Sequence, residues 1–522
     1  AAAATCPAAS GPTSADVEPL ARLRRLLGLA RRRRPARLPV EEAPRPVAGE
    51  NLLFISDLHL GEACKDHSRI EYLKRGGELD AHVCSFLEHH ARHTPGGRPW
   101  RLILGGDLLD FLQVTMTPPG TTGEAAIYGL GTREEESAWK VRRLMERHRE
   151  FFVYLADFIG AGHRIEIVQG NHDEELFWPA VRTAFVEGLV GLYFGDEGHP
   201  RLTPQAFAER IHFNPWFYYQ PGLVYVEHGH RFDDFCATPP QLCPLKPQAE
   251  DELVTPLSGL AIRYFANRQP GFRTHDKEHW GMREYFLFFR SMELRRTIDM
   301  LSCYARLIAR VGVYYVEHGR FRSDEALAAH ALRLEALAER GNVDRAQLTQ
   351  LESFGARSIM GRPLGLFTMM GLGDWTAVLL LLISIAMALA NDAPLWADLL
   401  LILGVGGGAL AAARGLRKLY PRDIKAKLDV AATRIGELLH PPVVVLGHSH
   451  RPVRRRMRHD HRAFYVNTGS FLLHEGEGHA PEAPCDCRST FARIEYPGEY
   501  GQPRPELLRW CAVRQAPAPY ES

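Results

Sequence analysis

The chain has 522 residues, and its 63 lysines and arginines against 62 aspartates and glutamates give a net charge of +1. This length allows two or more domains. The balanced charge excludes a protein that attracts polyanions over its whole surface, but it does not exclude local basic patches. Nine scattered cysteines lack any paired C-x-x-C spacing, which is typical of reduced thiols in a cytosolic setting. We interpret the lone C-x-C of Cys485 and Cys487 as ordinary loop cysteines.

The N-terminal stretch, residues 1–48, opens with small and turn-forming residues and lacks the basic-then-apolar order of a signal peptide. Five leucines between Leu20 and Leu29 can share one helical stripe with arginines on the other face, as in helices that lie at a membrane interface. A basic, partly disordered arm fits the same residues equally well. Both interpretations stay open for this segment.

Short apolar strands alternate with helical patterns across residues 49–238. We expect strands near 51–56, 100–106, 163–170 and 222–229, with helices near 69–93 and 134–162. The strands are continuous apolar runs, which is typical of strands buried on both faces. This alternation predicts the first part of an α/β domain.

Residues 239–440 have a different texture, because long helical patterns replace the alternation. Strand patterns return at 441–447, 463–469, 490–496 and 507–513. We therefore expect one α/β domain whose second part is 441–514, split by an α-helical insertion at 239–440 and followed by a tail at 515–522.

Each expected strand of the α/β part ends in polar side chains able to bind metal. In an extended segment, residues two apart point the same way, so a D-x-H or an H-x-H can reach one ion. Loops at the carboxyl ends of strands are where open α/β sheets build their sites. The candidate residues, in chain order, are Asp57, His59, Asp107, Asp110, Asn171, His172, Asp173, His228, His448 and His450.

In this order, the motifs D-x-H, G-D-x-x-D, G-N-H-D, H-G and G-H-x-H resemble the calcineurin-like metallophosphoesterase superfamily. The resemblance implies a metallophosphoesterase-type α/β sandwich with two β-sheets flanked by helices. It implies a first metal ion bound by Asp57, His59, Asp107 and His450, and a second bound by Asp107, Asn171, His228 and His448. It also implies that His172 faces the substrate and that Asp110 orients His172.

The donor set by itself indicates the kind of ion. Mixed carboxylate, imidazole and amide ligands suit Mn²⁺, Fe or Zn²⁺ better than Ca²⁺, and we expect Mn²⁺. Two divalent ions that share a carboxylate make a water nucleophilic near neutral pH and offset charge on phosphoryl oxygens. The sequence therefore predicts hydrolysis of a phosphate ester or anhydride.

The pentapeptide Y-V-E-H-G occurs twice, and only one copy fits this pattern. His228 follows a strand and lies between the G-N-H-D and G-H-x-H motifs, whereas His318 follows a helical stretch inside the insertion. We expect His228 to bind metal and His318 not to. His230 and Arg231, directly after the first copy, are candidates for contact with substrate.

Two apolar stretches in the insertion, about 367–390 and 395–413, are each close to the length that spans a bilayer. Trp375 and Trp396 lie near their starts, and Gly404 and Gly408 form a G-x-x-x-G that allows close helix approach. Basic residues flank the pair, and the turn between the stretches has none. By the positive-inside rule, we expect a membrane hairpin with the catalytic domain on the cytoplasmic side; a buried hairpin of a soluble protein is the alternative.

The expected function is dimetal hydrolysis at a membrane surface. The segments L-F-I-S-D-L-H-L-G, G-H-S-H-R-P and H-G-H-R-F-D-D are similar to UDP-2,3-diacylglucosamine pyrophosphatases. Because the hairpin lies between His228 and His448 in the sequence, it would hold the site close to the bilayer, and we expect a lipid-linked phosphate or pyrophosphate as substrate. One alternative is a nuclease, in which the basic run R-P-V-R-R-R-M-R-H-D-H-R after His450 would contact phosphates. Another is a non-catalytic membrane scaffold. The balanced charge and the membrane anchor both argue against the nuclease. The sequence leaves the oligomeric state open.

Overall fold

The structure is a computed structural model, and it describes residues 49–61, 69–195, 202–238, 240–246, 249–268, 293–318, 324–340, 343–390, 393–421, 423–458, 460–471, 489–496 and 501–520. The expectations for residues 1–48 and for Cys485 and Cys487 lie outside these residues. The described part confirms a mixed α/β protein with more than one mixed sheet.

The larger sheet has seven strands in the order β14-β13-β12-β1-β2-β3-β4. Four strands run parallel, namely β1 (Asn51–Ile55), β2 (Trp100–Gly105), β3 (Arg164–Val168) and β4 (Ile211–Asn214). The antiparallel strands are β12 (Thr490–Ile494), β13 (Glu506–Cys511) and β14 (Ala516–Pro519). The expectation of a tail at 515–522 is therefore wrong for β14, which pairs with β13.

The smaller sheet has five strands in the order β10-β11-β9-β6-β5. Its inner strands β11 (Phe464–Asn467), β9 (Val443–Leu446) and β6 (Val224–Glu227) are parallel. The outer strands β10 (Val453–Arg456) and β5 (Phe217–Gln220) are antiparallel to their neighbours. A separate hairpin pairs β7 (Leu245–Lys246) with β8 (Ala249–Leu253), so the insertion is not wholly helical.

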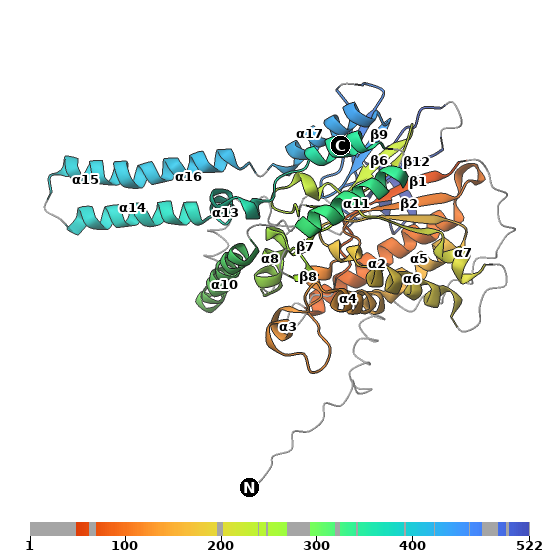
Figure 1. Cartoon of the computed structure of the whole chain (residues 1–522), viewed down its shortest axis with the longest axis horizontal. Helices are drawn as coiled ribbons and strands as arrows, with labels where there is room; N and C mark the ends of the chain where they lie inside the picture. Colours follow the sequence, from red (N-terminus) through yellow and green to blue (C-terminus); the bar gives the residue numbers. More distant parts are fainter. Residues whose placement is uncertain are drawn as a thin grey trace, which may run out of the picture. The chain divides into compact units, whose positions relative to one another are not determined.

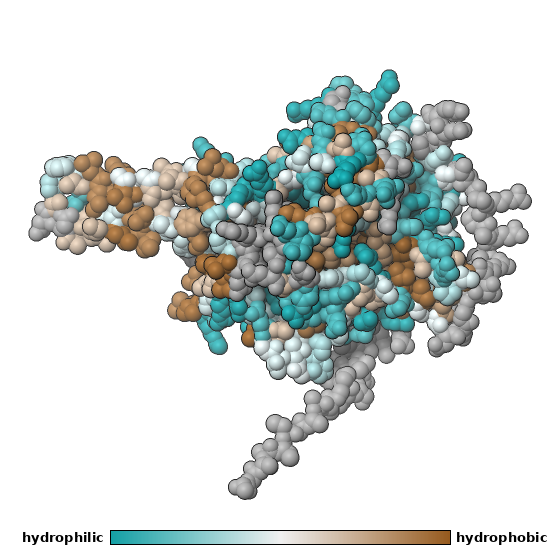
Figure 2. All heavy atoms as spheres, viewed as in Figure 1, coloured by the Kyte–Doolittle hydropathy of each residue, from teal (hydrophilic) through white to brown (hydrophobic). Residues whose placement is uncertain are grey.

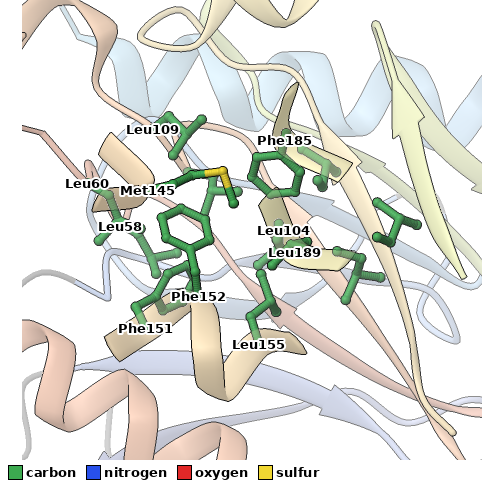
Figure 3. Close-up of a cluster of buried hydrophobic side chains, with 14 of the residues drawn as sticks. Leu58, Leu60, Leu104, Leu109, Met145, Phe151, Phe152, Leu155, Phe185 and Leu189 are labelled. Carbon is green, nitrogen blue, oxygen red and sulfur yellow. The ribbon is translucent and has the colours of Figure 1, made fainter. Parts of the chain in front are cut away.

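Three buried clusters show that the two sheets pack on each other and are covered by helices (Figure 1). Valines of β6, β9 and β11 meet apolar residues of β1, β2 and β12 between the sheets. The larger sheet is covered by α2 (Arg69–Arg92), α4 (Glu134–Arg147), α5 (Arg149–Gly160) and α6 (Pro179–Phe194). In Figure 3, Leu104 of β2 lies among Phe152, Leu155, Phe185 and Leu189 of α5 and α6. A phenylalanine buried this completely contributes about 1.5–3 kcal/mol.

The insertion contributes to the covering layer of the smaller sheet. Leu428 and Ile435 of α17 (Ile424–Leu439) are buried against it, together with residues of α11 (Asp324–Arg340) and α12 (Arg345–Ser353). The end of the expected insertion is therefore part of the α/β core. Two further helices of the insertion, α10 (Leu294–His318) and α8 (Leu257–Tyr264), pack against each other. Short helices elsewhere are α3 (Gly123–Tyr128), α7 (Pro204–Ala208) and α13 (Pro363–Met369).

The apolar stretches form two helical arms that lie side by side. One arm is α14 (Leu372–Ala390), and the other runs from α15 (Leu395–Leu401) through a π-helical turn (Ile402–Gly407) into α16 (Gly408–Leu419). The first arm begins later than the expected residue 367, because α13 ends at Met369 and Gly371 has φ +70°. The second arm extends to Leu419 rather than to residue 413. Arg417 and Asp374 pair at 3.3 Å at the base of the two arms, near the start of α14 and the end of α16.

Both arms are apolar and largely exposed (Figure 2). Only 11% of the apolar window of α14 is buried, whereas the core helix of a soluble protein would be mostly buried. The close approach expected at Gly404 and Gly408 is not seen among the described residues. Instead, a Cβ on Gly406 would lie 2.5 Å from Leu381 Cδ1, so Gly406 is the glycine that lets the arms approach.

Candidate metal centre

The candidate ligands all follow the carboxyl ends of parallel strands. Asp57 and His59 follow β1, Asp107 follows β2, Asn171 follows β3, and the remaining three follow strands of the smaller sheet: His228, His448 and His450. Parallel strands end at the same edge of a sheet, and the two sheets pack on each other, so these loops meet. The structure therefore brings together residues as far apart in sequence as Asp57 and His450.

Two groups of ligand atoms form, and Asp107 lies between them. In the first group, His450 Nε2 is 3.1 Å from Asp57 Oδ1 and 3.3 Å from His59 Nε2. In the second group, which also includes His448, His228 Nε2 is 3.2 Å from Asp107 Oδ2. Asp107 Oδ2 is also 3.6 Å from His59 Nε2. These buried histidines and aspartates could hold metal ions, with Asp107 within reach of both groups.

Backbone strain is concentrated at this cluster. Seven non-glycine residues in the described ranges have positive φ, and five of them are candidate ligands: Asp57, His59, Asp107, His448 and His450. A left-handed backbone costs such residues about 1–2 kcal/mol each. Such strain persists only where the surrounding structure holds it, and it is typical of functional sites.

Two glycines allow the loops to approach closely. Gly106 has φ +93°, and a Cβ at this position would lie 2.4 Å from Cγ of His228. A Cβ on Gly170 would lie 2.1 Å from Oδ1 of Asp107 and 2.5 Å from its backbone nitrogen. Glycine is therefore needed at both positions for Asp107 to sit between the loops after β3 and β6.

Hydrogen bonds from outside the cluster orient its ligands. His228 Nδ1 lies 3.0 Å from the Gly105 carbonyl oxygen, and a donated Nδ1–H leaves the lone pair of Nε2 directed at Asp107. Asp57 Oδ2 accepts hydrogen bonds from the Ser56 hydroxyl and, at 3.3 Å, from the His448 backbone N–H. Ser470 donates to the Asp57 carbonyl oxygen at 2.9 Å.

His172 and Asp110 lie close together beside the cluster, an arrangement that the resemblance implies. His172 Nδ1 is 3.0 Å from Asp110 Oδ2, and the His172 backbone N–H donates to Asp107 Oδ1 at 2.9 Å. Asp110 also accepts from Gln113 Nε2 at 2.7 Å, which fixes its carboxylate. Burial opposes ionisation of Asp110, but the neighbouring His172 outweighs it and holds the Asp110 pKa well below its usual range.

The electrostatics of the cluster favour bound cations. Burial alone lowers the pKa of a histidine, yet Asp107 raises the pKa of His228 to about 9, and Asp110 with Asp107 raises that of His172 to about 10. The carboxylates thus create a strong local demand for positive charge. Asn171 Oδ1 is buried and accepts no hydrogen bond within the described part of the chain, which suits a metal ligand.

Several side chains in or near the site behave differently from a simple ligand. Asp173 accepts from Gly170 N–H at 2.6 Å and Leu108 N–H at 2.8 Å, so it fastens the loop after β3 to the loop after β2. His230 is buried, and its Nδ1 has no hydrogen bond among the described residues, so it remains a candidate for substrate contact. His318 is the last residue of α10, and its side chain lies outside the described part.

The expectation that Arg231 contacts substrate is not supported by its surroundings. Its guanidinium is buried, pairs with Glu227, and donates from Nη1 to the Leu351 carbonyl oxygen at 2.9 Å. It also stacks on Trp216 and Phe232. Arg231 therefore joins the smaller sheet to α12. Sequence reasoning also missed Asp233, whose Oδ2 lies 3.4 Å from His448 Nε2; the only signal was its place in H-G-H-R-F-D-D.

Comparisons with protein-family models, curated proteins and solved structures found no match to this chain. What fold and site define together is a mixed α/β protein with a buried cluster of histidines and aspartates that could hold a metal ion. Two apolar helical arms of the same chain are long enough to cross a membrane.

Proposed function

We propose that this chain is a calcineurin-like metallophosphoesterase that hydrolyses a phosphate ester or anhydride at a membrane surface. The observation that carries the proposal is the position of Asp107 between two buried ligand groups, one with Asp57, His59 and His450 and the other with His228 and His448. A shared carboxylate between two sets of ligands is what a two-metal site requires. The layered sheets flanked by helices also agree with this superfamily.

The residues fit two divalent ions, and Mn²⁺ is the metal that we propose for both sites. The first would be held by Asp57, His59, Asp107 and His450, and the second by Asp107, Asn171, His228 and His448. When bound, such ions supply an activated water and offset charge on phosphoryl oxygens. The chain itself contributes the strained loops that hold the ligands and the buried surroundings that strengthen every charge interaction in the site.

His172 is the proposed proton donor. His172 Nδ1 lies 3.0 Å from Asp110 Oδ2, and an ion pair at this distance holds the ring and favours a proton on that nitrogen. A protonated ring then presents Nε2–H to the substrate, where it stabilises a phosphoryl oxygen or gives its proton to the leaving oxygen. Asp110 acts through His172 as its positioning residue.

The two helical arms are proposed to form a membrane hairpin. Their exposed leucines and tryptophans have no apolar partner large enough to cover them in the described part of the chain, and a bilayer would bury them. Arg357 and Arg362 precede the hairpin and Arg414, Arg417 and Lys418 end it, while its turn has no basic residue. By the positive-inside rule, this distribution supports the proposal that the catalytic domain is on the cytoplasmic side.

A site held at the bilayer suits a substrate whose phosphate lies at the headgroup level. A lipid-linked phosphate or pyrophosphate gains effective concentration and orientation from such placement, whereas a soluble substrate gains nothing. The nuclease stays the alternative function. Three arginines of its basic run already have partners within the chain, because Arg454 donates to the Pro505 carbonyl oxygen, Arg455 pairs with Asp429, and Arg456 donates to the His461 carbonyl oxygen.

The test of the proposal combines metal content with activity. Full-length protein, in detergent with Mn²⁺, is expected to bind two ions per chain and to hydrolyse a phosphoester. Asp107→Asn is expected to lose activity and most of the second ion, whereas Asp251→Asn, which changes an exposed carboxylate on β8, is expected to change neither. Full activity with one bound ion would refute the two-metal proposal.

The substrate class needs a separate comparison. The rate on a lipid-linked phosphoester in mixed micelles is compared with the rate on its chain-free analogue, with nucleic acid as a third substrate. Equal rates on the first two would remove the lipid proposal and leave the hydrolase proposal standing. Preferential cleavage of nucleic acid, with steep salt dependence, would favour the nuclease.

A further inference from the structure

An acidic pair, Asp233 and Asp234, lies between the metal cluster and the base of the hairpin. It follows the short 3₁₀ helix His230–Phe232, which itself follows the candidate ligand His228. Asp233 Oδ2 is 3.4 Å from His448 Nε2. The next carboxylate, Asp234, is buried and pairs with two cations of the insertion, one of which, Lys427, also lies 3.9 Å from Asp233 Oδ1.

Those two cations flank the hairpin in the chain. Arg362, just before α13 and the first arm, donates from Nη2 to Asp234 Oδ2 at 2.8 Å. Lys427, in the first turns of α17 after the second arm, pairs with Asp234 Oδ1. The guanidinium of Arg362 also lies over the ring of Tyr420, which directly follows α16, at 5.4 Å. Both ends of the hairpin are thus tied to one carboxylate.

Backbone hydrogen bonds reinforce the same connection. The segment that leads into the hairpin runs along the loop after His228, because Ala356 N–H donates to the Arg231 carbonyl oxygen and Ile359 N–H to that of Asp234, each at 2.8 Å. On the other side, Leu428 of α17 approaches Gly229 so closely that a Cβ there would lie 2.9 Å from Leu428 Cδ2. Movement at the hairpin base therefore reaches the loop that carries His228 and Asp233.

His448 is the candidate ligand that contacts this loop through Asp233. Its φ of +66° is a strained conformation that depends on its surroundings. If Asp233 accepts the Nε2–H of His448, Nδ1 keeps a free lone pair for a metal ion, which is the usual role of a carboxylate behind a histidine ligand. Asp233 thus fixes both the tautomer and the ring position of His448.

We infer that Asp233 and Asp234 are positioning residues that couple the membrane hairpin to the second metal ion, through Arg362 and Lys427 on one side and His448 on the other. This inference rests on the proposed two-metal function. It adds that the affinity for the second ion depends on the contacts at the hairpin base. If the hairpin were only an anchor, changes to these contacts would leave that affinity unchanged.

The experiment measures Mn²⁺ binding by isothermal titration, with full-length protein in bilayer nanodiscs. Asp233→Asn is expected to weaken the second ion about 10- to 100-fold, as for other partners behind a metal ligand, and to leave the first ion unchanged. Asp234→Asn and Arg362→Gln are expected to weaken the second ion by about 2- to 30-fold, since they act one contact further away. Arg362→Lys, which keeps the charge, is expected to restore most of the affinity.

Glu335→Gln is the matched control, because it breaks an exposed pair with Arg345 between α11 and α12, elsewhere in the insertion. It is expected to leave both ions unchanged. Equal weakening of both ions in Asp233→Asn, or no weakening of either in Asp233→Asn and Asp234→Asn, would overturn the inference. A wild-type chain that binds only one ion would instead overturn the proposed function on which the inference rests.

Discussion

Replacement of Gly106 by alanine tests whether the close approach of two loops sets the geometry of the site. A Cβ at this position would lie 2.4 Å from Cγ and 2.5 Å from Nδ1 of His228, where ordinary contact begins near 3.4 Å. The imidazole ring must therefore retreat by about 1 Å, a displacement that costs about 100-fold in rate when it affects a group at the reacting centre. The retreat also disturbs the contact between His228 Nδ1 and the Gly105 carbonyl oxygen.

The matched control is Gly120→Ala. Gly120 has φ +84°, similar to the +93° of Gly106, but no atom of the described residues lies within 4 Å of an added Cβ. Both variants should lose about 1–2 kcal/mol of stability from the left-handed backbone, and only Gly106→Ala should lose phosphoesterase activity and affinity for the second Mn²⁺. The assay compares initial rates, Mn²⁺ titrations and melting temperatures. Equal loss of activity in the two variants would show that strain, and not displacement of His228, is responsible.

Three further predictions follow from other parts of the molecule. His228→Ala should abolish turnover through loss of a metal ligand while His318→Ala changes it little, and comparable damage from both in a rate assay would mean that the second Y-V-E-H-G also serves the site. The full chain should stay with the membrane pellet in high salt, because ions do not screen apolar contacts, and a variant with Leu372–Leu419 replaced by a polar linker should be released; a full chain that is soluble without detergent would contradict the hairpin. Burial lowers the pKa of His90 to about 3, only partly offset by its bond to the Phe86 carbonyl oxygen, so the unfolded chain binds this proton more tightly. The free energy of unfolding is therefore unaffected by this titration above about pH 6.5, and it falls by an amount on the order of a few kcal/mol as the pH drops toward 3. Melting temperatures at pH 5 and pH 7.5 should accordingly differ less in His90→Gln than in the wild-type chain.

The site residues could be predicted because each motif is local. A buried strand, a tight turn and a polar side chain lie within about ten residues of one another, and the carboxyl ends of parallel strands must meet. The pairing of His172 with Asp110 was expected from the resemblance, and the structure brings them to 3.0 Å. The contact of Asp107 with both ligand groups was also expected in this way.

The remaining features depend on contacts that no local pattern contains. Arg231 looked available for substrate, but its partner Leu351 lies 120 residues away in the sequence. The strand β14 was missed because a short proline-containing segment resembles a loop, although an edge strand tolerates proline. The G-x-x-x-G motif pointed to the wrong glycines, since the π-helical turn at 402–407 changes which residue faces the neighbouring arm.

The order of the strands has a consequence for how the protein is made. The central strand of the smaller sheet, β9, and the ligands His448 and His450 follow the hairpin in the chain, while Asp57, Asp107 and His228 precede it. Synthesis proceeds from the N-terminal end of the chain, and a domain generally folds as a unit. The two arms therefore leave the ribosome before β9 can join β6, while both candidate ligand groups are still incomplete. For the membrane hairpin and two-metal site proposed above, metal loading is then expected to follow membrane insertion.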